Sequence, residues 1–263
     1  MFTEIVSYQD VKDNNSEVAE FEVLSGRPLC VSPRSGFSAV ASKAWPPNIA
    51  GPNKGRLETF AANIPEHLRS AVAKRKLEFL SGRLCAMHAA QQLGVSLNQV
   101  QKGLYGEPCW PIGVVGSISH SDKLACALIS RRDGNTHVGI DLEDLSNSKG
   151  MEELESLILT RKERNWIGNE QNERDQIILQ IFCLKESVYK AIFPIVRRYV
   201  DFKEVSLFPE ALGSWKIVVG SRLSQELCEW KLLLNLELFE DHLFAVCEAS
   251  KSKVPACPAL AIT

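Results

Sequence analysis

The sequence lacks the features of secreted and membrane-spanning proteins. Eight cysteines occur among the 263 residues, but none forms a C-x-x-C pair, and Cys126 and Cys247 lie inside apolar runs. Such cysteines are typical of small buried side chains in a reducing compartment, and not of a disulfide framework or a zinc site. No apolar run is long enough to cross a bilayer, and the first residues do not resemble a secretory signal. We therefore expect a cytoplasmic protein without a membrane span.

Strong net charge is also missing. The formal net charge is −2, so nothing global favours nucleic acid or a membrane surface, and we expect neither as a partner. Hydrophobic residues make up 45% and charged residues 24%, which are ordinary values for a globular protein. A chain of 263 residues allows one large domain or two modest ones.

Residues 138–143 are the stretch with the clearest chemistry. Apolar side chains alternate there with Gly139, Asp141 and Glu143, which predicts a half-buried strand with its apolar face on a core. The two carboxylates then point the same way, and Gly139 leaves room beside them for a ligand. Oxygen ligands of this kind suit a hard cation such as Mg²⁺. An isolated D-x-E pair is more often a solvated strand end, so the interpretation depends on other parts of the chain.

A long helix is predicted from about Pro65 to Leu93, because apolar residues recur at helical spacing and Gly94 follows. Arg75 and Arg83 project from similar sides of this helix. Together they could hold a phosphate through charge-assisted hydrogen bonds. Taken alone, a solvated basic face is the favoured explanation of these residues.

Two loops before the acidic strand suit close approach to a ligand. Residues 102–111 contain two glycines and two prolines, and Lys102 at their start could meet a phosphate or only water. Near Gly116, the Ser119 hydroxyl and the His120 ring could both donate to a phosphate oxygen. A Ser-His pair also raises nucleophilic catalysis, but no G-x-S-x-G elbow surrounds it.

Thr160, followed three residues later by Glu163, predicts a capping box at the start of a short helix.

Residues 175–192 predict a second long helix with an apolar stripe that Lys185 and Glu186 interrupt. Glu186 and Lys190 are spaced i,i+4 and could form a plain surface ion pair. Alternatively, Glu186 is a third acid for the metal and Lys185 is a phosphate ligand. Unpaired charge near a core is costly, which favours the functional interpretation.

The turn signal at residues 131–135 separates two apolar runs, 124–129 and 137–143, and predicts an antiparallel hairpin between them. We place a domain boundary there. The expected parts are an N-terminal half (1–135), a C-terminal half (136–250) and a flexible tail (251–263).

The two halves show a faint internal similarity. Residues 241–246 echo residues 122–127, and each echo follows a long helix. Strands at 230–239 and 243–247 form a second predicted hairpin. The sequence therefore predicts two related α+β halves.

Four short blocks, in this order, resemble motifs of the 4′-phosphopantetheinyl transferases of the surfactin and enterobactin-synthase-component-D type. Residues 106–111 resemble the G-x-P loop, 116–120 resemble G-S-[IL]-[ST]-H, 139–143 resemble G-[IV]-D-x-E, and 182–187 resemble [WF]-x-x-K-E-[AS]. A fifth block, 74–83, is similar to the arginine helix of the component-D branch. Each block is weak alone, but their order and spacing are highly specific. Phe182 and Ser187 stand where many members have Trp and Ala.

The resemblance implies an α+β fold of two halves with pseudo-twofold symmetry and an active site between them. It implies transfer of 4′-phosphopantetheine from coenzyme A to a serine of an apo carrier protein, with release of 3′,5′-ADP. Asp141, Glu143 and Glu186 would hold Mg²⁺. Catalytic roles would fall to Asp141, to Glu186 as ligand or base, and to Lys185 at the transferring phosphate. The coenzyme A-binding set would be Arg75, Arg83, Lys102, Pro108, Ser119, His120, Asp141, Lys185 and Lys190.

The implied macromolecular partner is an acidic, helical acyl, peptidyl or aryl carrier protein, and the component-D likeness favours siderophore or other nonribosomal peptide or polyketide biosynthesis. We expect a monomer. A basic and apolar patch for the carrier is predicted at Phe193, Arg197, Arg198 and Tyr199. Two alternatives stay open: a Mg²⁺-dependent phosphohydrolase of coenzyme A or nucleotides, and an inactive scaffold that binds coenzyme A or carrier proteins.

Overall fold

The structure is a computed structural model, and it describes residues 4–8, 21–25, 37–43, 65–97, 99–122, 124–131, 135–168, 173–210, 215–239 and 241–252. The chain divides into two compact units, residues 1–131 and 132–263. The boundary predicted after residue 135 falls between the last strand of the first unit and the first strand of the second. Most of the predicted tail (253–263) lies outside the described residues.

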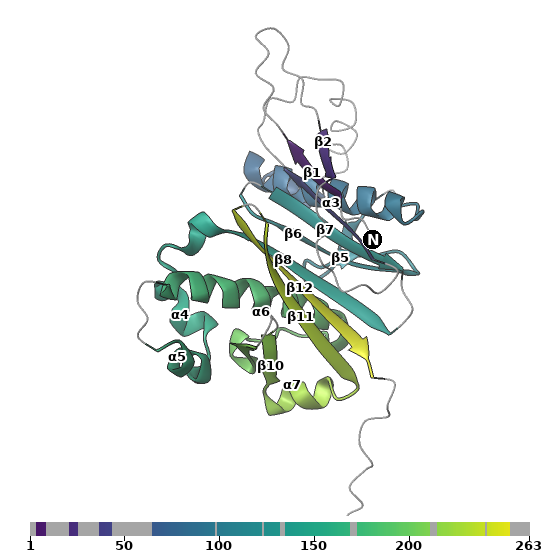
Figure 1. Cartoon of the computed structure of the whole chain (residues 1–263). Helices are drawn as coiled ribbons and strands as arrows, with labels where there is room; N and C mark the ends of the chain where they lie inside the picture. Colours follow the sequence, from purple (N-terminus) through teal and green to yellow (C-terminus); the bar gives the residue numbers. More distant parts are fainter. Residues whose placement is uncertain are drawn as a thin grey trace, which may run out of the picture. The chain divides into compact units, whose positions relative to one another are not determined.

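The first unit is a mainly antiparallel sheet covered on one face by a long helix (Figure 1). Its elements are β1 (Glu4–Tyr8), β2 (Phe21–Ser25), β3 (Phe37–Lys43), α2 (Glu66–Arg69), α3 (Ala73–Gln92), β4 (Gln101–Lys102), β5 (Pro108–Cys109), β6 (Val114–His120) and β7 (Leu124–Arg131). The strand order is β2-β1-β3-β7-β6, and only β1 and β3 run parallel. β4 and β5 form a separate short hairpin.

Helix α3 rests on the sheet through small residues. The buried core beneath it consists of Cys85, Ala86, Ala89, Ala90, Leu97, Val100, Val114, Ala125, Ala127 and Ile129. Gly82 is part of this contact, because a Cβ there would lie 2.5 Å from the Cγ2 atom of Ile118. The helix is continuous through Gly82, and the stretch predicted as one helix is interrupted at residues 70–72.

The second unit places a long helix against a three-stranded sheet. Its elements are β8 (Thr136–Asp144), η1 (Leu145–Ser148), α4 (Met151–Ile158), α5 (Arg161–Ile167), α6 (Arg174–Val196), η2 (Phe202–Glu204), β9 (Val205–Pro209), β10 (Trp215–Val219), α7 (Ser221–Glu226), β11 (Trp230–Phe239) and β12 (His242–Lys251). The main sheet has the order β11-β12-β8, and β9 pairs with β10. α6 continues through Pro194, beyond the end predicted at Ile192.

Both units repeat one topology. In the first, strand β3 is followed by helix α3 and the hairpin β6-β7, and β7 pairs with β3. In the second, strand β8 is followed by helix α6 and the hairpin β11-β12, and β12 pairs with β8. The α+β fold class and the similarity between halves are thus present in the strand order. Their symmetric arrangement stays a prediction.

The predicted hairpin between residues 124–129 and 137–143 is wrong. β7 lies in a sheet between β3 and β6, whereas β8 pairs with β12 along its whole length, from Thr136 opposite Ser250 to Asp144 opposite His242. The segment between the two runs contains the boundary between the two units. The second predicted hairpin is confirmed, with Phe239 opposite His242.

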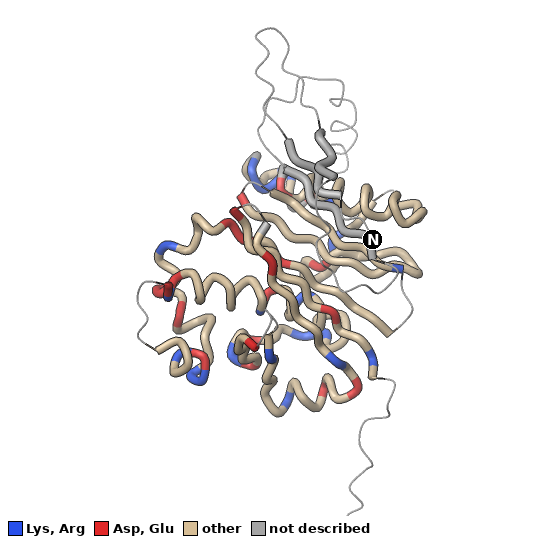
Figure 2. The backbone as a smooth tube through the Cα atoms, in the orientation of Figure 1, with Lys and Arg blue, Asp and Glu red and all other residues tan. Residues whose placement is uncertain are grey.

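No helix in the described part of the chain is long and apolar enough to cross a membrane. Acidic and basic residues are interspersed along the second unit (Figure 2), as the small net charge suggests.

Candidate active site

Strand β8 and helix α6 approach each other unusually closely at Gly139. A Cβ on this residue would lie 2.0 Å from the backbone oxygen of Ser187 and 2.4 Å from the backbone nitrogen of Ala191. Only a residue without a side chain permits this contact. The space beside the two carboxylates that was expected for a ligand is therefore filled at Gly139 by the backbone of α6.

The strand is not half-buried as predicted, because all residues from Val138 to Leu142 are buried. The acid-bearing face is the one that meets the α6 core: across the ladder Gly139 lies opposite Cys247, and Asp141 opposite Ala245, and both partners belong to that core. Asp141 and Glu143 thus point towards α6, whose own polar side chains complete the site.

Lys190 of α6 meets the first of these acids. Its Nζ donates to Asp141 Oδ1 at 2.6 Å, and the Asp141 side chain is only 5% exposed while that of Lys190 is 27% exposed. Burying a carboxylate is costly unless an opposite charge lies beside it. The ammonium group of Lys190 provides it, and the long stem reaches from the core towards solvent.

Glu186 lies one helical turn before Lys190 and is half-buried. Burial raises the pKa of its carboxyl group; the nearby Asp141 carboxylate also raises this pKa, and Lys190 opposes both. The raised pKa therefore reflects mainly the removal of this carboxyl group from water, which the charge of Lys190 does not fully offset. A further cation near Glu186 would lower that pKa.

Cys183 lies under the same cluster. The residue is fully buried, and burial, followed by the charges of Asp141 and Glu143, raises the pKa of its thiol well above the usual value. The thiol is therefore neutral, and it donates weakly to the backbone oxygen of Leu243 at 3.8 Å. Both β8 carboxylates are close enough to act on one buried sulfur atom.

The donor set suits a hard divalent cation, although among the described residues no three acidic, histidine or cysteine side chains already lie together as a metal site. Asp141, Glu143 and Glu186 offer carboxylate oxygens, which are the ligands Mg²⁺ uses in proteins. The raised pKa of Glu186 indicates where added positive charge would be favourable. The residues present therefore fit Mg²⁺.

Lys185 does not belong to the cluster around Asp141. Its Nζ donates to Glu163 Oε2 at 2.8 Å, to the Ile158 oxygen at 2.8 Å and to the Phe202 oxygen at 3.0 Å. Its side chain is 1% exposed and that of Glu163 is fully buried. All three donor positions of the ammonium group are used. The phosphate-stabilising role expected for Lys185 does not follow from this position.

In the first unit, Arg75 and His120 come together as the sequence suggested. Arg75 Nη1 lies 3.1 Å from His120 Nε2 and 3.0 Å from Glu78 Oε2. His120 ends β6 on the face towards α3, because its ladder partner Ala125 belongs to the core beneath that helix. Glu78 neutralises part of the positive charge at this point.

Arg83 is held more deeply. Its Nε donates to the Val100 oxygen at 3.2 Å, and its guanidinium carbon lies 3.4 Å from the centre of the Phe79 ring. Burial lowers the pKa of Arg83 to about 10, and the charge of Arg75 contributes in the same direction. Arg83 still carries its charge at neutral pH, and its closeness to Arg75 makes a region of two cations that an anion would stabilise.

Family models match both units. A model described as the 4′-phosphopantetheinyl transferase N-terminal domain matches residues 64–130, and one for the 4′-phosphopantetheinyl transferase superfamily matches residues 137–247. The chain belongs to this superfamily. The matched ranges contain every residue of the two clusters described above.

Curated members of the superfamily are similar to part of this chain. The 4′-phosphopantetheinyl transferase PptT of Mycobacterium tuberculosis is 39% identical over 150 residues, which cover 55% of this chain and 64% of that protein. Enterobactin synthase component D of Salmonella typhimurium is 38% identical over 130 residues, which cover 49% of this chain and 53% of that protein. The similarity thus spans between half and two thirds of these relatives.

Among solved structures, holo-[acyl-carrier-protein] synthase from Neisseria meningitidis is 23% identical, with a TM-score of 0.38 over 43% of this chain and 97% of that one. The synthase from Bacillus anthracis in complex with coenzyme A (3′,5′-ADP) is 21% identical, with a TM-score of 0.36 over 44% and 96%.

The remaining superfamily motif residues lie on the first unit. Lys102 and Pro108 are paired across the β4-β5 hairpin. Ser119 is buried and lies opposite Cys126, on the face of β6 away from His120. Adjacent residues of a strand point to opposite faces. The sequence had suggested that both side chains donate to one phosphate oxygen. Because they point to opposite faces of the strand, they cannot do so side by side.

Three residues near these clusters were not predicted as site residues: Glu78, Glu163 and Cys183. Glu78 follows Arg75 by three positions on a helix, a spacing that predicts the observed ion pair. Glu163 was found as part of a capping box with Thr160, which the structure confirms, but its partner Lys185 lies 22 residues away.

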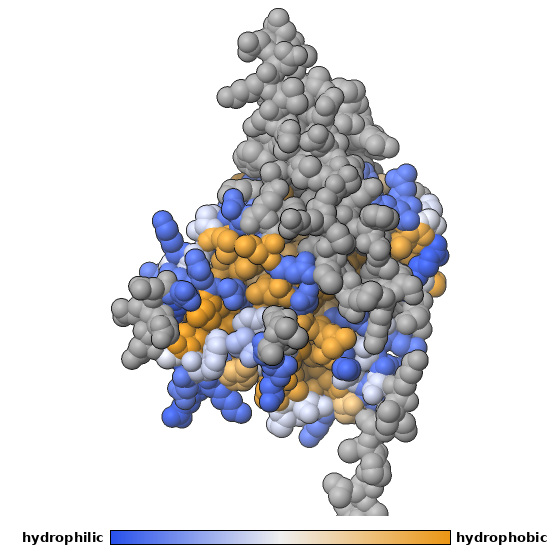
Figure 3. All heavy atoms as spheres, viewed as in Figure 1, coloured by the Kyte–Doolittle hydropathy of each residue, from blue (hydrophilic) through white to orange (hydrophobic). Residues whose placement is uncertain are grey.

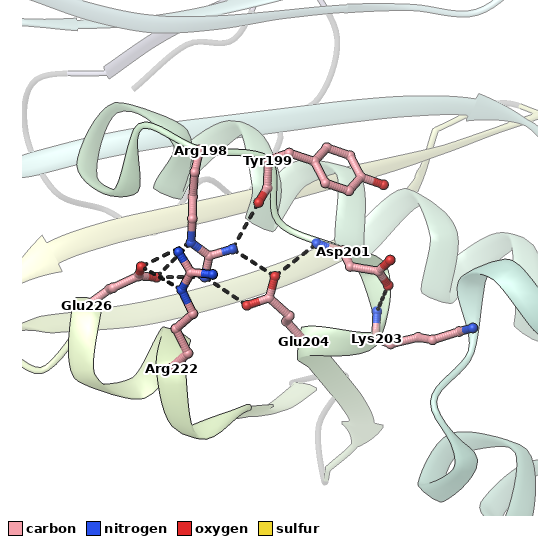
Figure 4. A network of polar contacts seen from close by, with 7 residues as sticks. All are labelled: Arg198, Tyr199, Asp201, Lys203, Glu204, Arg222 and Glu226. Carbon is pink, nitrogen blue, oxygen red and sulfur yellow. Dashed lines mark hydrogen bonds and ion pairs between the residues drawn. The ribbon is translucent and has the colours of Figure 1, made fainter.

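The predicted carrier patch is only partly available at the surface. Arg197 and Tyr199 are exposed, but Phe193 is buried. Arg198 is held by two acids, with Nη2 2.7 Å from Glu204 Oε2 and 2.7 Å from Glu226 Oε2 (Figure 4). Its guanidinium group ties α6 to η2 and α7, so it is not free for a partner. Other exposed apolar side chains of this unit include Leu154 and Leu157 on α4, and apolar surface appears in several places of the view in Figure 3.

Proposed function

We propose that this chain transfers 4′-phosphopantetheine from coenzyme A to a serine of an apo carrier protein in a Mg²⁺-dependent reaction. The observation that carries the proposal is the close contact of β8 with α6 at Gly139, which gathers Asp141, Glu186 and Lys190 at one point. Superfamily membership and the names of the relatives support the same reaction.

Asp141, Glu143 and Glu186 would hold the metal. When bound, Mg²⁺ would neutralise the negative charge that grows on the pyrophosphate as the P–O bond breaks. Lys190 is placed to serve the same phosphates, since its ammonium group already lies against Asp141 and its side chain reaches solvent. Lys190 therefore takes the place in the proposal that the family resemblance implied for Lys185.

Glu186 is the proposed base for the carrier serine. The serine oxygen forms a new bond to phosphorus, the bond from phosphorus to 3′,5′-ADP breaks, and the serine proton passes to the Glu186 carboxylate. A carboxyl group whose pKa lies above its ordinary value accepts a proton more readily near neutral pH.

The first unit would bind the phosphates of coenzyme A. Arg75, Arg83 and His120 supply two cations and a ring nitrogen in one cluster. Lys102 and Pro108 on the β4-β5 hairpin would extend this surface. For Ser119, the strand geometry favours a contact through its backbone, because its side chain points to the other face. That the active site lies between the two units stays a prediction.

The carrier protein is expected to be acidic and helical. The likeness to enterobactin synthase component D favours carriers of siderophore or other nonribosomal peptide biosynthesis. A cytoplasmic monomer is the expected form of the enzyme.

The test is an intact-mass assay. Apo acyl, peptidyl and aryl carrier proteins are incubated with the chain, coenzyme A and Mg²⁺, with and without EDTA. A gain of one phosphopantetheine that EDTA abolishes supports the proposal. Consumption of coenzyme A without any carrier would indicate a phosphohydrolase. Coenzyme A binding without turnover on any carrier would indicate a scaffold.

A further inference from the structure

Helix α6 carries two separate sets of polar residues on opposite sides. The helix turns by about 100° per residue. By that count, the residues shown above to lie at or near β8 share one side: Cys183, Glu186, Ser187, Lys190 and Ala191. Lys185 lies on the other side of the helix, where it meets Glu163.

The Lys185 ammonium joins four segments at one buried point. It binds the last turn of α4 through Ile158, the first turn of α5 through Glu163, and the start of η2 through Phe202, while its own backbone belongs to α6. The three acceptors fix the Lys185 side chain in one position.

Glu163 is equally constrained. Its Oε2 accepts from the backbone nitrogen of Thr160 at 2.7 Å, and its Oε1 accepts from the backbone nitrogen of Leu207 at 2.8 Å. Both carboxylate oxygens are thus tied to backbone that does not belong to α6. The pair anchors α6 to a frame made of α5 and β9.

We propose that the buried Glu163–Lys185 pair sets the rotation of α6 about its own axis, and so positions Glu186 and Lys190 against Asp141. The contact at Gly139 fixes how close α6 lies to β8, but a glycine has no side chain that could fix the rotation. The anchor holds the end of a long side chain away from the helix axis, so a rotation of α6 would have to break its hydrogen bonds. Lys185 and Glu163 are therefore positioning residues.

The geometry gives the size of the effect. Side-chain ends lie roughly 5–6 Å from a helix axis, so a rotation of about 10° moves them by about 1 Å. A misplacement of about 1 Å can lower a rate by on the order of 100-fold. Losing a group that supports metal ligands lowers metal affinity or activity by roughly 10–100-fold.

The experiment compares wild type, Lys185→Met, Lys185→Arg and Glu163→Gln with Leu223→Ala, a control for lost stability. Leu223 is fully buried in α7 and belongs to the same core as α6, but it takes no part in the hydrogen bonds of either charged pair. The readouts are kcat, the KM for coenzyme A, the free energy of unfolding, and the Kd of coenzyme A by calorimetry in EDTA and in Mg²⁺.

We expect Lys185→Met to lower kcat by on the order of 100-fold and to remove most of the Mg²⁺-dependent gain in coenzyme A affinity. The Kd in EDTA should change far less, because most of the phosphate-binding residues proposed above lie in the first unit and only Lys190 depends on the rotation of α6. Lys185→Arg, which keeps a cation for Glu163, should recover part of kcat. Glu163→Gln keeps its backbone acceptor and should lie between wild type and Lys185→Met.

The inference would be overturned if Lys185→Met and Leu223→Ala lost the same unfolding free energy and also had the same kcat and the same Mg²⁺-dependent gain in coenzyme A affinity. If Lys185→Met does not fold, the same comparison is made with Glu163→Gln. The expected loss of kcat rests on the proposed function, whereas the expected change in the Mg²⁺-dependent affinity for coenzyme A does not. If wild type transfers nothing to any carrier, the proposed function fails, and an unchanged Mg²⁺ response in Lys185→Met would then overturn the positioning role separately.

Discussion

The backbone oxygen of Ser187 lies 2.0 Å from the point that a Cβ on Gly139 would occupy. We expect Gly139→Ala to force β8 and α6 apart. The atoms that the new Cβ would meet, the Ser187 oxygen and the Ala191 nitrogen, belong to the backbone and not to a flexible side chain. Overpacking of this kind costs about 1–3 kcal/mol. Urea unfolding should show that loss, and the transfer assay should show a weaker Mg²⁺ response. Gly220→Ala is the matched control, because its nearest non-adjacent atom would be 3.6 Å away. Equal stability of the two variants would contradict the prediction.

Glu186→Gln should separate activity from stability. The variant lacks a proton acceptor, and loss of a general base lowers a rate by roughly 10²–10⁴-fold. The pKa of Glu186 is raised in the folded state, so its ionisation opposes folding as pH rises above the ordinary carboxyl pKa of 4.5. In EDTA the variant should therefore be at least as stable as wild type at pH 8. That advantage should disappear near pH 4, where the carboxyl is protonated in both states. Unfolding curves at both pH values test the sign.

Asp141→Asn should remove the dependence on Mg²⁺ together with turnover. The amide lacks the charge that a hard cation requires, and it leaves Lys190 without its charged partner. Wild type in the presence of coenzyme A should melt at a higher temperature when Mg²⁺ is added, because a ligand that binds only the folded state stabilises it. The variant should show no such shift. A Mg²⁺ titration that matches wild type would remove Asp141 from the metal site.

Glu78→Gln should strengthen coenzyme A binding, whereas Arg75→Ala should weaken it. Glu78 Oε2 lies 3.0 Å from Arg75 Nη1 and competes with a phosphate for that guanidinium group. Arg75 is exposed, so its removal should raise the KM for coenzyme A with little loss of stability. Arg83→Ala should raise the same KM and also destabilise, because it removes the contact with Phe79 and the bond to Val100. An effect confined to the carrier KM would place these residues on the other substrate.

Much of the fold followed from local sequence patterns. The capping box of Thr160 and Glu163 and the hairpin of β11 with β12 were predicted from short spacings, and both are confirmed. The pairing of β8 could not be predicted in this way, because its partner β12 lies about a hundred residues further along the chain.

The site shows the same limit on a smaller scale. Lys185 and Glu186 are adjacent in sequence, which suggested one shared task. Helix geometry turns them about 100° apart, and each then meets partners from distant segments. Gly139 was taken to leave space for a ligand, whereas its neighbour is the α6 backbone. The hydrophobic period and the residue spacing identify which residues share a helix or strand. They do not identify which distant segment packs against that helix or strand.

All pairings of the described strands stay within one of the two units, and each unit has its own long helix and buried core. A chain cut within residues 132–134 would therefore break none of these ladders. The protein could be produced as two separate polypeptides, each retaining its sheet and its helix. If the proposed function is correct and the reaction needs residues of both units, transfer by the two fragments should depend on the concentrations of both.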